Sequence, residues 1–224
     1  MRRFDRAALQ VVRERLEALP RKRFDRMLPM EQRKQIFPED VGEYERRAQR
    51  KAAVAIPLLN FEGAAGVLFT VRSTRVGTHG GQVSFPGGHV EETEVPEQAA
   101  VRELMEETAI HPAGFDVLGR WHDVRAITGT MVSPVVGFVQ QELGKADLDG
   151  MVEAAGSSEE VDSCFVLTLQ ELLDPKKQTV ENLRGYRMPR FTAGPQPVWG
   201  LTAFILGNVL RDTGLQQTQA GPAS

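Results

Sequence analysis

Residues 87–110 read GGHVEETEVPEQAAVRELMEETAI. A helix is predicted over residues 96–108, because Pro96 suits a first helical position and Glu97 suits the positive end of the helix dipole. The glycine-rich turn Phe85–Gly88 comes just before this stretch and can bring the backbone close to a ligand. The sequence therefore predicts a tight loop that leads into a helix.

Three carboxylates share one face of this predicted helix. Glu103, Glu106 and Glu107 stand at i, i+3 and i+4, and such like charges destabilise a helix by a few tenths of a kcal/mol. A divalent cation would compensate, since Mg²⁺ prefers carboxylate oxygens and shares its shell with substrate phosphates. The alternative is a solvated acidic surface. The residues expected on the opposite, buried face are Val101, Leu104, Met105 and Thr108.

The same residues fit the Nudix box, Gly-x5-Glu-x7-Arg-Glu-U-x-Glu-Glu-x-Gly-U, where U is bulky and apolar. The final glycine is replaced by Ala109, and a left-handed helix end there would cost alanine about 1 kcal/mol. The chain thus resembles a Nudix hydrolase, which implies an α/β/α sandwich with a mixed central sheet. The matching residues are Gly88, Glu94, Arg102, Glu103, Leu104, Glu106, Glu107 and Ile110.

The resemblance continues outside the box. Residues 68–88, LFTVRSTRVGTHGGQVSFPGG, are similar to the motif LLTxRSxxxRxxxGxxxFPGG of the coenzyme A pyrophosphatase subgroup. Residues 52–58 and 198–203 (VWGLTA) also look like this subgroup. Gly77 replaces the second arginine of the motif, and Arg75 is a candidate substitute for its charge. This likeness covers most of the chain.

The subgroup resemblance implies a reaction and its metal. It implies hydrolysis of the pyrophosphate bond of coenzyme A or an acyl-CoA to 3′,5′-ADP and 4′-phosphopantetheine, with Mg²⁺ or Mn²⁺ as the cofactor. Glu103, Glu106 and Glu107 are the implied metal ligands. Arg102 and Glu94 form an implied structural pair that orients them.

The general base and the substrate contacts follow from the same resemblance. Glu106 or Glu103 is the first choice for the base, and Glu160 is the second because it stands just before a predicted strand. For each of these glutamates, the alternative is an ordinary solvated charge on the protein surface. The residues implied to contact substrate are Arg72, Ser73, Arg75, Gly81, Phe85, Gly87 and Gly88.

The box does not choose the substrate, so rival hypotheses stay open. One is a Nudix hydrolase of ADP-ribose, NADH or a nucleotide triphosphate. Another is a Nudix-fold binding module without turnover, although every box glutamate is present. A third gives the basic N-terminal region a second function, such as attachment to RNA or to a membrane.

Composition sets outer bounds. The chain has 224 residues, of which 41% are apolar and 25% charged, and a net charge of −3. These values are typical of a globular protein and exclude a disordered, collagen-like or coiled-coil chain. No apolar run approaches the roughly 18 residues of a membrane span. A single cysteine, Cys164, excludes an intrachain disulfide and favours a reducing compartment, the cytoplasm or a mitochondrion. The C-terminus lacks a peroxisomal Ser-Lys-Leu signal.

Charge divides the chain into a basic start and an acidic remainder. Residues 1–50 hold 14 Lys and Arg against 9 Asp and Glu, and are expected to form a helical extension with a helix at 5–19 and an irregular 20–50. This extension could be a solvated helix, a targeting segment or the interface of a homodimer. Its scarcity of aromatic residues argues against a nucleic-acid partner. Residues 51–213 are the expected Nudix domain and 214–224 a disordered tail.

The remaining pattern predicts mixed strands and helices, hence an α/β sandwich. Residues 144–159 are expected to form a polar loop. Trp199 and Cys164 are expected to pack in the interior. The predicted strands are 52–59, 66–72, 116–123, 131–139 and 161–167, and the predicted helices beyond the box are 169–173 and 198–211.

Overall fold

The computed structural model describes residues 3–20, 22–25, 27, 29–40, 42–75, 80–157, 159–183 and 186–217. The helices are α1 (Arg6–Ala18), α2 (Met30–Ile36), α3 (Gly42–Ala48), α4 (Pro96–Thr108), α5 (Lys145–Ala155), α6 (Leu169–Leu172) and α7 (Gly200–Asp212). The strands are β1 (Arg23–Phe24), β2 (Lys51–Phe61), β3 (Ala64–Arg72), β4 (Val83–Ser84), β5 (Gly87–His89), β6 (Phe115–Arg120), β7 (Asp123–Arg125), β8 (Met131–Val139), β9 (Val161–Thr168), β10 (Gln178–Leu183) and β11 (Tyr186–Phe191).

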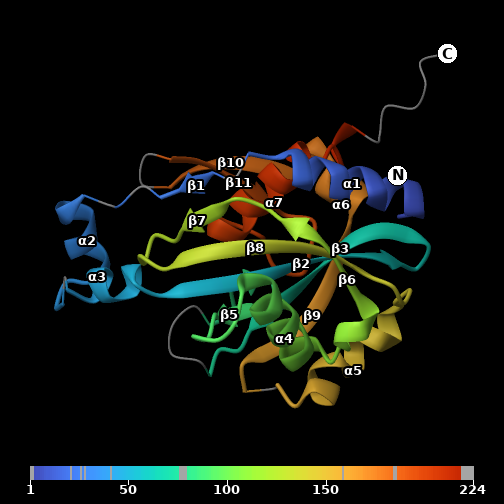
Figure 1. The fold of residues 1–224 in the computed structure, drawn as a ribbon, viewed down its shortest axis with the longest axis horizontal. Coiled ribbons are helices and arrows are strands. Elements are labelled where there is room, and N and C mark those ends of the chain that lie inside the picture. Colours follow the sequence, from blue (N-terminus) through green and yellow to red (C-terminus); the bar gives the residue numbers. More distant parts are fainter. Residues whose placement is uncertain are drawn as a thin grey trace.

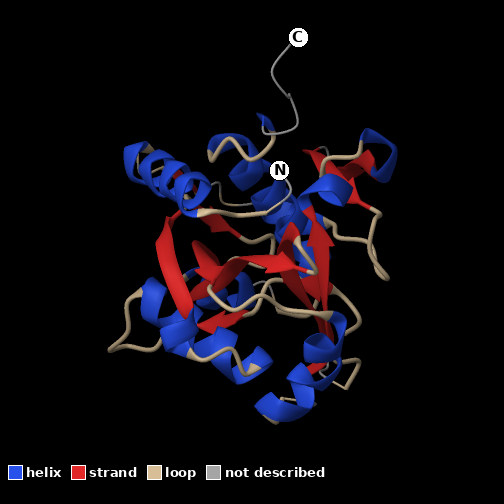
Figure 2. Ribbon diagram, turned by 90° about the vertical axis from the view of Figure 1, so that its right-hand side faces the viewer, coloured by secondary structure: helices blue, strands red, loops and turns tan. Residues whose placement is uncertain are grey.

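A mixed sheet lies between two layers of helices (Figures 1 and 2). In the described residues it has nine strands along the path β1-β7-β8-β2-β3-β4, with β5 on β2, β6 on β8 and β9 on β3. The pairs β2–β8 and β1–β7 are parallel, and the other pairs of this sheet are antiparallel. The predicted α/β/α sandwich with a mixed sheet is confirmed.

Alternate residues of the central strand β2 serve the two layers, as the two-residue period of a strand requires. Ala53, Ala55 and Leu59 join the buried cluster beneath α4 and α5. Ile56 and Leu58 join the other cluster, which also contains side chains of α1 and α7. Because β2 is buried on both faces, it fixes the positions of the strands that pair with its edges.

The strong local patterns are confirmed, and the weak ones are not. The predicted strands at 52–59, 66–72, 131–139 and 161–167 all form, whereas 116–123 divides into β6 and β7. The predicted polar loop at 144–159 is wrong, because α5 forms there and buries Met151 and Val152. The hairpin β10–β11 was not predicted, although it lies against α7.

The first fifty residues are not irregular beyond the first helix. They contain β1, which extends the main sheet by pairing with β7, and the short helices α2 and α3. The helix α1 forms as predicted, and Val12 and Leu16 pack in the same core as α7. Val12 and Leu16 are thus used within the chain, and a homodimer stays a prediction. The boundaries of the Nudix domain, expected at residues 51–213, stay a prediction.

A buried amide fixes the start of the chain. The Asn60 side chain in β2 accepts a hydrogen bond from the Phe4 N–H at 2.7 Å and donates one to the Phe4 carbonyl at 3.0 Å. Residue 60 is thereby joined to a residue 56 positions earlier. This pair of bonds holds α1 against the sheet.

The carboxyl end is ordered further than expected. The predicted tail begins at residue 214, but residues 214–217 form a turn in which Leu215 is 2% exposed and belongs to the core. The Gln216 N–H donates to the Leu210 carbonyl. Residues 218–224 lie outside the described residues.

The helix α4 ends in the strained way that the box departure predicts. Ala109 has φ 57° and ψ 10°, a left-handed conformation, and its N–H donates to the Met105 carbonyl at 2.8 Å. Ala109→Gly should raise the free energy of unfolding by about 1 kcal/mol, because glycine adopts this conformation without strain. Urea denaturation measures it. Ala155→Gly in the last turn of α5 is the matched control and should lower stability; stabilisation by both or by neither would refute the argument.

Candidate active site

The acidic helix α4 lies on the β2 and β5 side of the sheet and buries a face that includes a carboxylate. Ala99, Ala100, Leu104 and Thr108 are buried, and so is Glu107, which is only 5% exposed. Met105, predicted on the buried face, is 38% exposed. The predicted buried stripe is therefore wrong at that position, since the sheet covers the side of the helix that carries Glu107.

Arg102 gathers the carboxylates at the exposed edge of this helix. Its Nε and Nη2 donate to the two carboxylate oxygens of Glu94 at 2.8 and 3.1 Å, and Nη2 also reaches the His89 carbonyl at 3.0 Å. Its Nη1 donates to Glu103 at 2.8 Å and to Glu106 at 3.0 Å. The bond with Arg102 holds the pKa of Glu94 below its ordinary value. The structure thus contains the Arg102–Glu94 pair that the resemblance implies. Arg102 also connects this pair to Glu103 and Glu106, two of the predicted metal ligands.

Glu107 faces inward, where its charge is costly. Burial raises the pKa of Glu107 to about 7, and the nearby Glu103 charge pushes it the same way. The opposing influences on this pKa are the Gly87 N–H, which donates to Glu107 Oε1 at 3.3 Å, the Arg72 charge and the Thr70 hydroxyl. Burial also raises the pKa of Glu103. Two neighbouring carboxylates are thus held where a positive ion would stabilise both.

Gly87 and Gly88 are required in the turn because neighbouring atoms of the protein approach their Cα atoms closely. A side chain on Gly87 would collide with the Ala53 carbonyl and with Val54 in β2. A Cβ on Gly88 would lie 2.5 Å from Cδ and 2.6 Å from Oε2 of Glu103. The backbone therefore runs directly beside the carboxylates, as the glycine-rich turn predicted.

Glu160 approaches the same cluster from the start of β9. Its carbonyl accepts the Ser73 N–H at 2.8 Å, which ties the two loops together. The Glu160 side chain is exposed, and its charge contributes to the raised pKa of Glu103. The candidate general base from outside the box thus lies within electrostatic reach of the acidic helix.

The donor set fits a hard divalent cation, although the carboxylates do not converge on one point. In the described residues no three Asp, Glu, His or Cys side chains form a ready metal cluster, and Glu103 and Glu106 turn toward Arg102. The fit rests on the buried Glu107 and the raised pKa values, because a cation lowers the cost of ionising both groups. Carboxylate oxygens are the ligands that Mg²⁺ and Mn²⁺ take.

Three of four further predicted substrate contacts have other local roles in this structure. Ser73 is fully buried and its hydroxyl accepts the Arg75 N–H at 3.3 Å, which argues against direct contact with substrate. Phe85 is buried and stacks on Phe69 with ring centroids 5.3 Å apart. Gly81 has φ +74° and closes a turn onto Arg72, and Arg75 is exposed. Position 77 lies outside the described residues.

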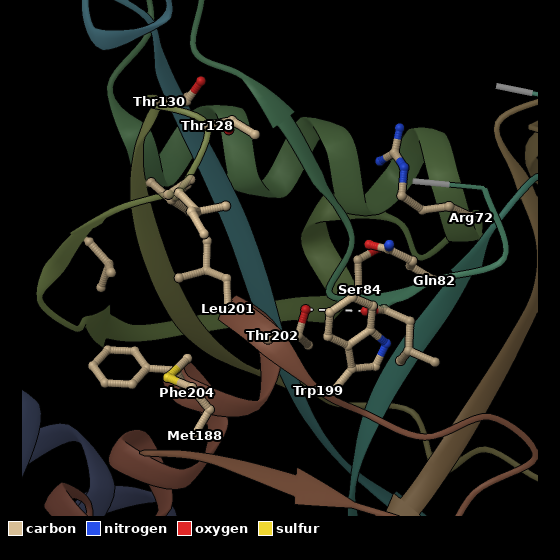
Figure 3. A pocket seen from close by; sticks show the side chains of 16 residues that line it. Arg72, Gln82, Ser84, Thr128, Thr130, Met188, Trp199, Leu201, Thr202 and Phe204 are labelled. Carbon is tan, nitrogen blue, oxygen red and sulfur yellow. Dashed lines mark hydrogen bonds between the residues drawn. The ribbon is translucent and has the colours of Figure 1, made fainter. Parts of the chain in front are cut away.

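A pocket of about 770 Å³ lies next to this cluster, and the sequence analysis missed it (Figure 3). Arg72 lines one edge, close enough to Glu107 to influence its pKa. Trp199, expected to pack in the interior, lines the pocket instead. The other lining residues are Gln82, Val83, Ser84, Val124, Ala126, Ile127, Thr128, Thr130, Val132, Met188, Gly200, Leu201, Thr202 and Phe204.

Family comparison agrees with the fold and the acidic helix. Residues 49–188 match the NUDIX domain family. The chain belongs to the Nudix hydrolases, an enzyme family that acts on pyrophosphate bonds and generally uses divalent metal ions.

Two bacterial relatives are described as uncharacterized Nudix hydrolase NudL. The protein of Enterobacter sp. (strain 638) is 34% identical over 173 residues, which is 75% of this chain and 85% of the relative. The protein of Escherichia coli (strain K12 / DH10B) is 33% identical over 172 residues, or 75% and 84%. A solved structure, a C. elegans Ap4A hydrolase binary complex, has 18% identity and a TM-score of 0.46 over 76% of this chain and 98% of that one. No helix in the described residues is long and apolar enough to span a membrane.

Proposed function

We propose that this Nudix hydrolase cleaves the pyrophosphate bond of coenzyme A or an acyl-CoA, giving 3′,5′-ADP and 4′-phosphopantetheine. One observation carries the proposal: two stretches that resemble the coenzyme A subgroup, far apart in the chain, line a single pocket. Val83 and Ser84 come from the first stretch, and Trp199 and Thr202 from the second. The Thr202 hydroxyl donates to the Val83 carbonyl at 3.2 Å and so joins the two.

The proposed chemistry is attack of water on one phosphorus and departure of the other phosphate. Bound Mg²⁺ or Mn²⁺ would neutralise phosphate charge and lower the pKa of the attacking water. Glu103, Glu106 and Glu107 would hold the metal, with Arg102 restraining the first two. Glu106 or Glu103 would take the proton of the water, and Glu160 is the alternative base because it approaches Glu103 from β9.

Arg72 is the substrate-binding residue that the geometry supports most directly. It stands between the buried carboxylate and the pocket, so its guanidinium can meet a phosphate oxygen of a substrate that occupies both. Gly87 and Gly88 let the chain turn tightly beside the carboxylates. We further propose an intracellular protein, and of the two compartments expected, the bacterial relatives favour the cytoplasm over a mitochondrion.

Product analysis by mass spectrometry tests the function. The protein is incubated with coenzyme A and Mg²⁺ or Mn²⁺, beside ADP-ribose, NADH and a nucleotide triphosphate. Release of 4′-phosphopantetheine and 3′,5′-ADP is expected, with a loss of at least 100-fold in Glu106→Gln. A Glu160→Gln variant separates Glu160 from the box glutamates as candidate base, because loss of the true base should also remove the acidic limb of the pH profile.

Other outcomes would overturn parts of this proposal. Cleavage of ADP-ribose, NADH or a triphosphate with coenzyme A left intact would replace the substrate and keep the reaction class. No cleavage of any substrate with either metal would favour a binding module without turnover.

A further inference from the structure

The pocket beside the acidic helix is apolar over most of its wall. Val124 of β7 and Val132 of β8 form one side, and Ile127 lies in the loop between these strands. Leu201 and Phe204 of α7 form the facing side, and Met188 is supplied by the hairpin β10–β11. The cavity volume falls within the 300–1,000 Å³ that small-molecule sites have.

Two hydroxyl groups of the wall are already engaged with the protein. The Thr202 hydroxyl donates to the Val83 carbonyl (Figure 3). The Ser84 hydroxyl lies 3.2 Å from the Thr70 hydroxyl. A nucleobase placed against the apolar part of this wall would leave ring nitrogens and amino groups without partners, which weakens binding strongly. A flexible apolar group suits this interior better than a base does.

The charge of the pocket is concentrated at one end. Figure 3 shows Arg72 at the edge near α4, with Phe204 and Met188 on the far side. A phosphate held beside Arg72 and Glu107 therefore has an apolar channel leading away from it. The occupant should therefore be anionic at the Arg72 end and apolar at the far end.

We propose that this pocket receives the acyl-pantetheine arm of the substrate, so that the enzyme prefers acyl-CoA esters to free coenzyme A. This inference rests on the proposed function, and it states which part of the substrate the enzyme uses to select among coenzyme A derivatives. A longer acyl chain covers more of the apolar wall, and free coenzyme A leaves the far end unfilled.

A chain-length series tests the preference directly. The value of kcat/KM is measured for free coenzyme A and for its acetyl, butanoyl, hexanoyl and octanoyl esters with Mg²⁺. Each added methylene should raise kcat/KM about threefold until the pocket is full, because burying a methylene is favourable. Equal or falling values along the series would overturn the proposal and leave the function in place.

A substitution in the wall ties the preference to this pocket. Ile127 is 38% exposed, so Ile127→Asn should fold, and the melting temperature checks this. The ratio of octanoyl-CoA to coenzyme A in kcat/KM should fall about tenfold. Val11→Asn on α1, at 45% exposure and away from the pocket lining, is the matched control and should keep the ratio. An unchanged ratio in Ile127→Asn would overturn the proposal.

A binding measurement separates this inference from the proposed function. If no coenzyme A derivative is cleaved, the function fails, and octanoyl-pantetheine, which carries no phosphate, is titrated while tryptophan fluorescence is followed. A saturable change that disappears in Trp199→Phe supports an apolar site in this pocket. No change, or displacement of the compound by 3′,5′-ADP, would show that the pocket does not hold the acyl arm.

Discussion

A Glu107→Gln variant should melt at a higher temperature than the natural protein at pH 8 in EDTA, and yet be inactive. The folded protein holds the Glu107 pKa at about 7, whereas the ordinary value is 4.5. The folded state therefore keeps the proton longer, and its stability falls as the pH rises from about 4.5 to 7. The loss amounts to at most about 3 kcal/mol, and glutamine removes it.

The pH dependence is what distinguishes this from ordinary stabilisation. In EDTA the melting temperature of Glu107→Gln should exceed that of the natural protein by about 6 °C at pH 8, and the gain should shrink toward pH 5. Glu153→Gln, on an exposed position of α5, is the matched control and should shift it little at either pH. The same difference at both pH values would refute the argument.

The metal response completes this prediction. Addition of Mg²⁺ or Mn²⁺ should raise the melting temperature of the natural protein and have little effect on Glu107→Gln, because a ligand that binds only the folded state stabilises it. Activity should fall at least 100-fold in the variant. A variant that keeps both the metal response and the activity would remove Glu107 from the metal ligands.

The second large effect is expected at a glycine. Gly88→Ala should lower kcat about 100-fold, since the new methyl group occupies the space of the Glu103 carboxylate and must displace it. Misplacement of a catalytic group by about 1 Å has that order of effect. The displacement also disturbs Arg102 and Glu106, which share hydrogen bonds with Glu103 through the guanidinium.

Gly150→Ala is the matched control for this substitution. It lies in α5 with nothing within 4 Å of an added Cβ, and alanine favours a helix, so activity should be kept and stability slightly raised. Steady-state kinetics with Mg²⁺ and thermal melting of both variants make the test. Full activity in Gly88→Ala would mean that Glu103 works in another position.

The acidic helix was predictable because its signals are local. Pro96 marks its start, the glutamate spacing defines a face, and the box accounts for Arg102 and the turn before it. A helix pattern gives the angle between side chains but not which side the sheet covers. For that reason the burial of Glu107 and the exposure of Met105 came only from the structure.

Other features were missed for reasons that lie in the sequence. The polar composition around α5 concealed a helix, although Leu148, Met151 and Val152 stand at helical spacing and were the available signal. The pocket could not be predicted from local pattern, because it joins residues 72 to 204 through the fold. The likeness of residues 198–203 to one subgroup was the only hint that they meet the first motif.

The hydrogen bonds between Asn60 and Phe4 bear on how the protein can be cut and fused. A truncated chain that starts at residue 51 would leave the buried Asn60 amide without either partner, and an unsatisfied buried polar group costs about 1–3 kcal/mol. A purification tag fused close to Phe4 must leave the Phe4 N–H and carbonyl free to make these two bonds. Expression plasmids should therefore encode the first helix together with the rest of the domain.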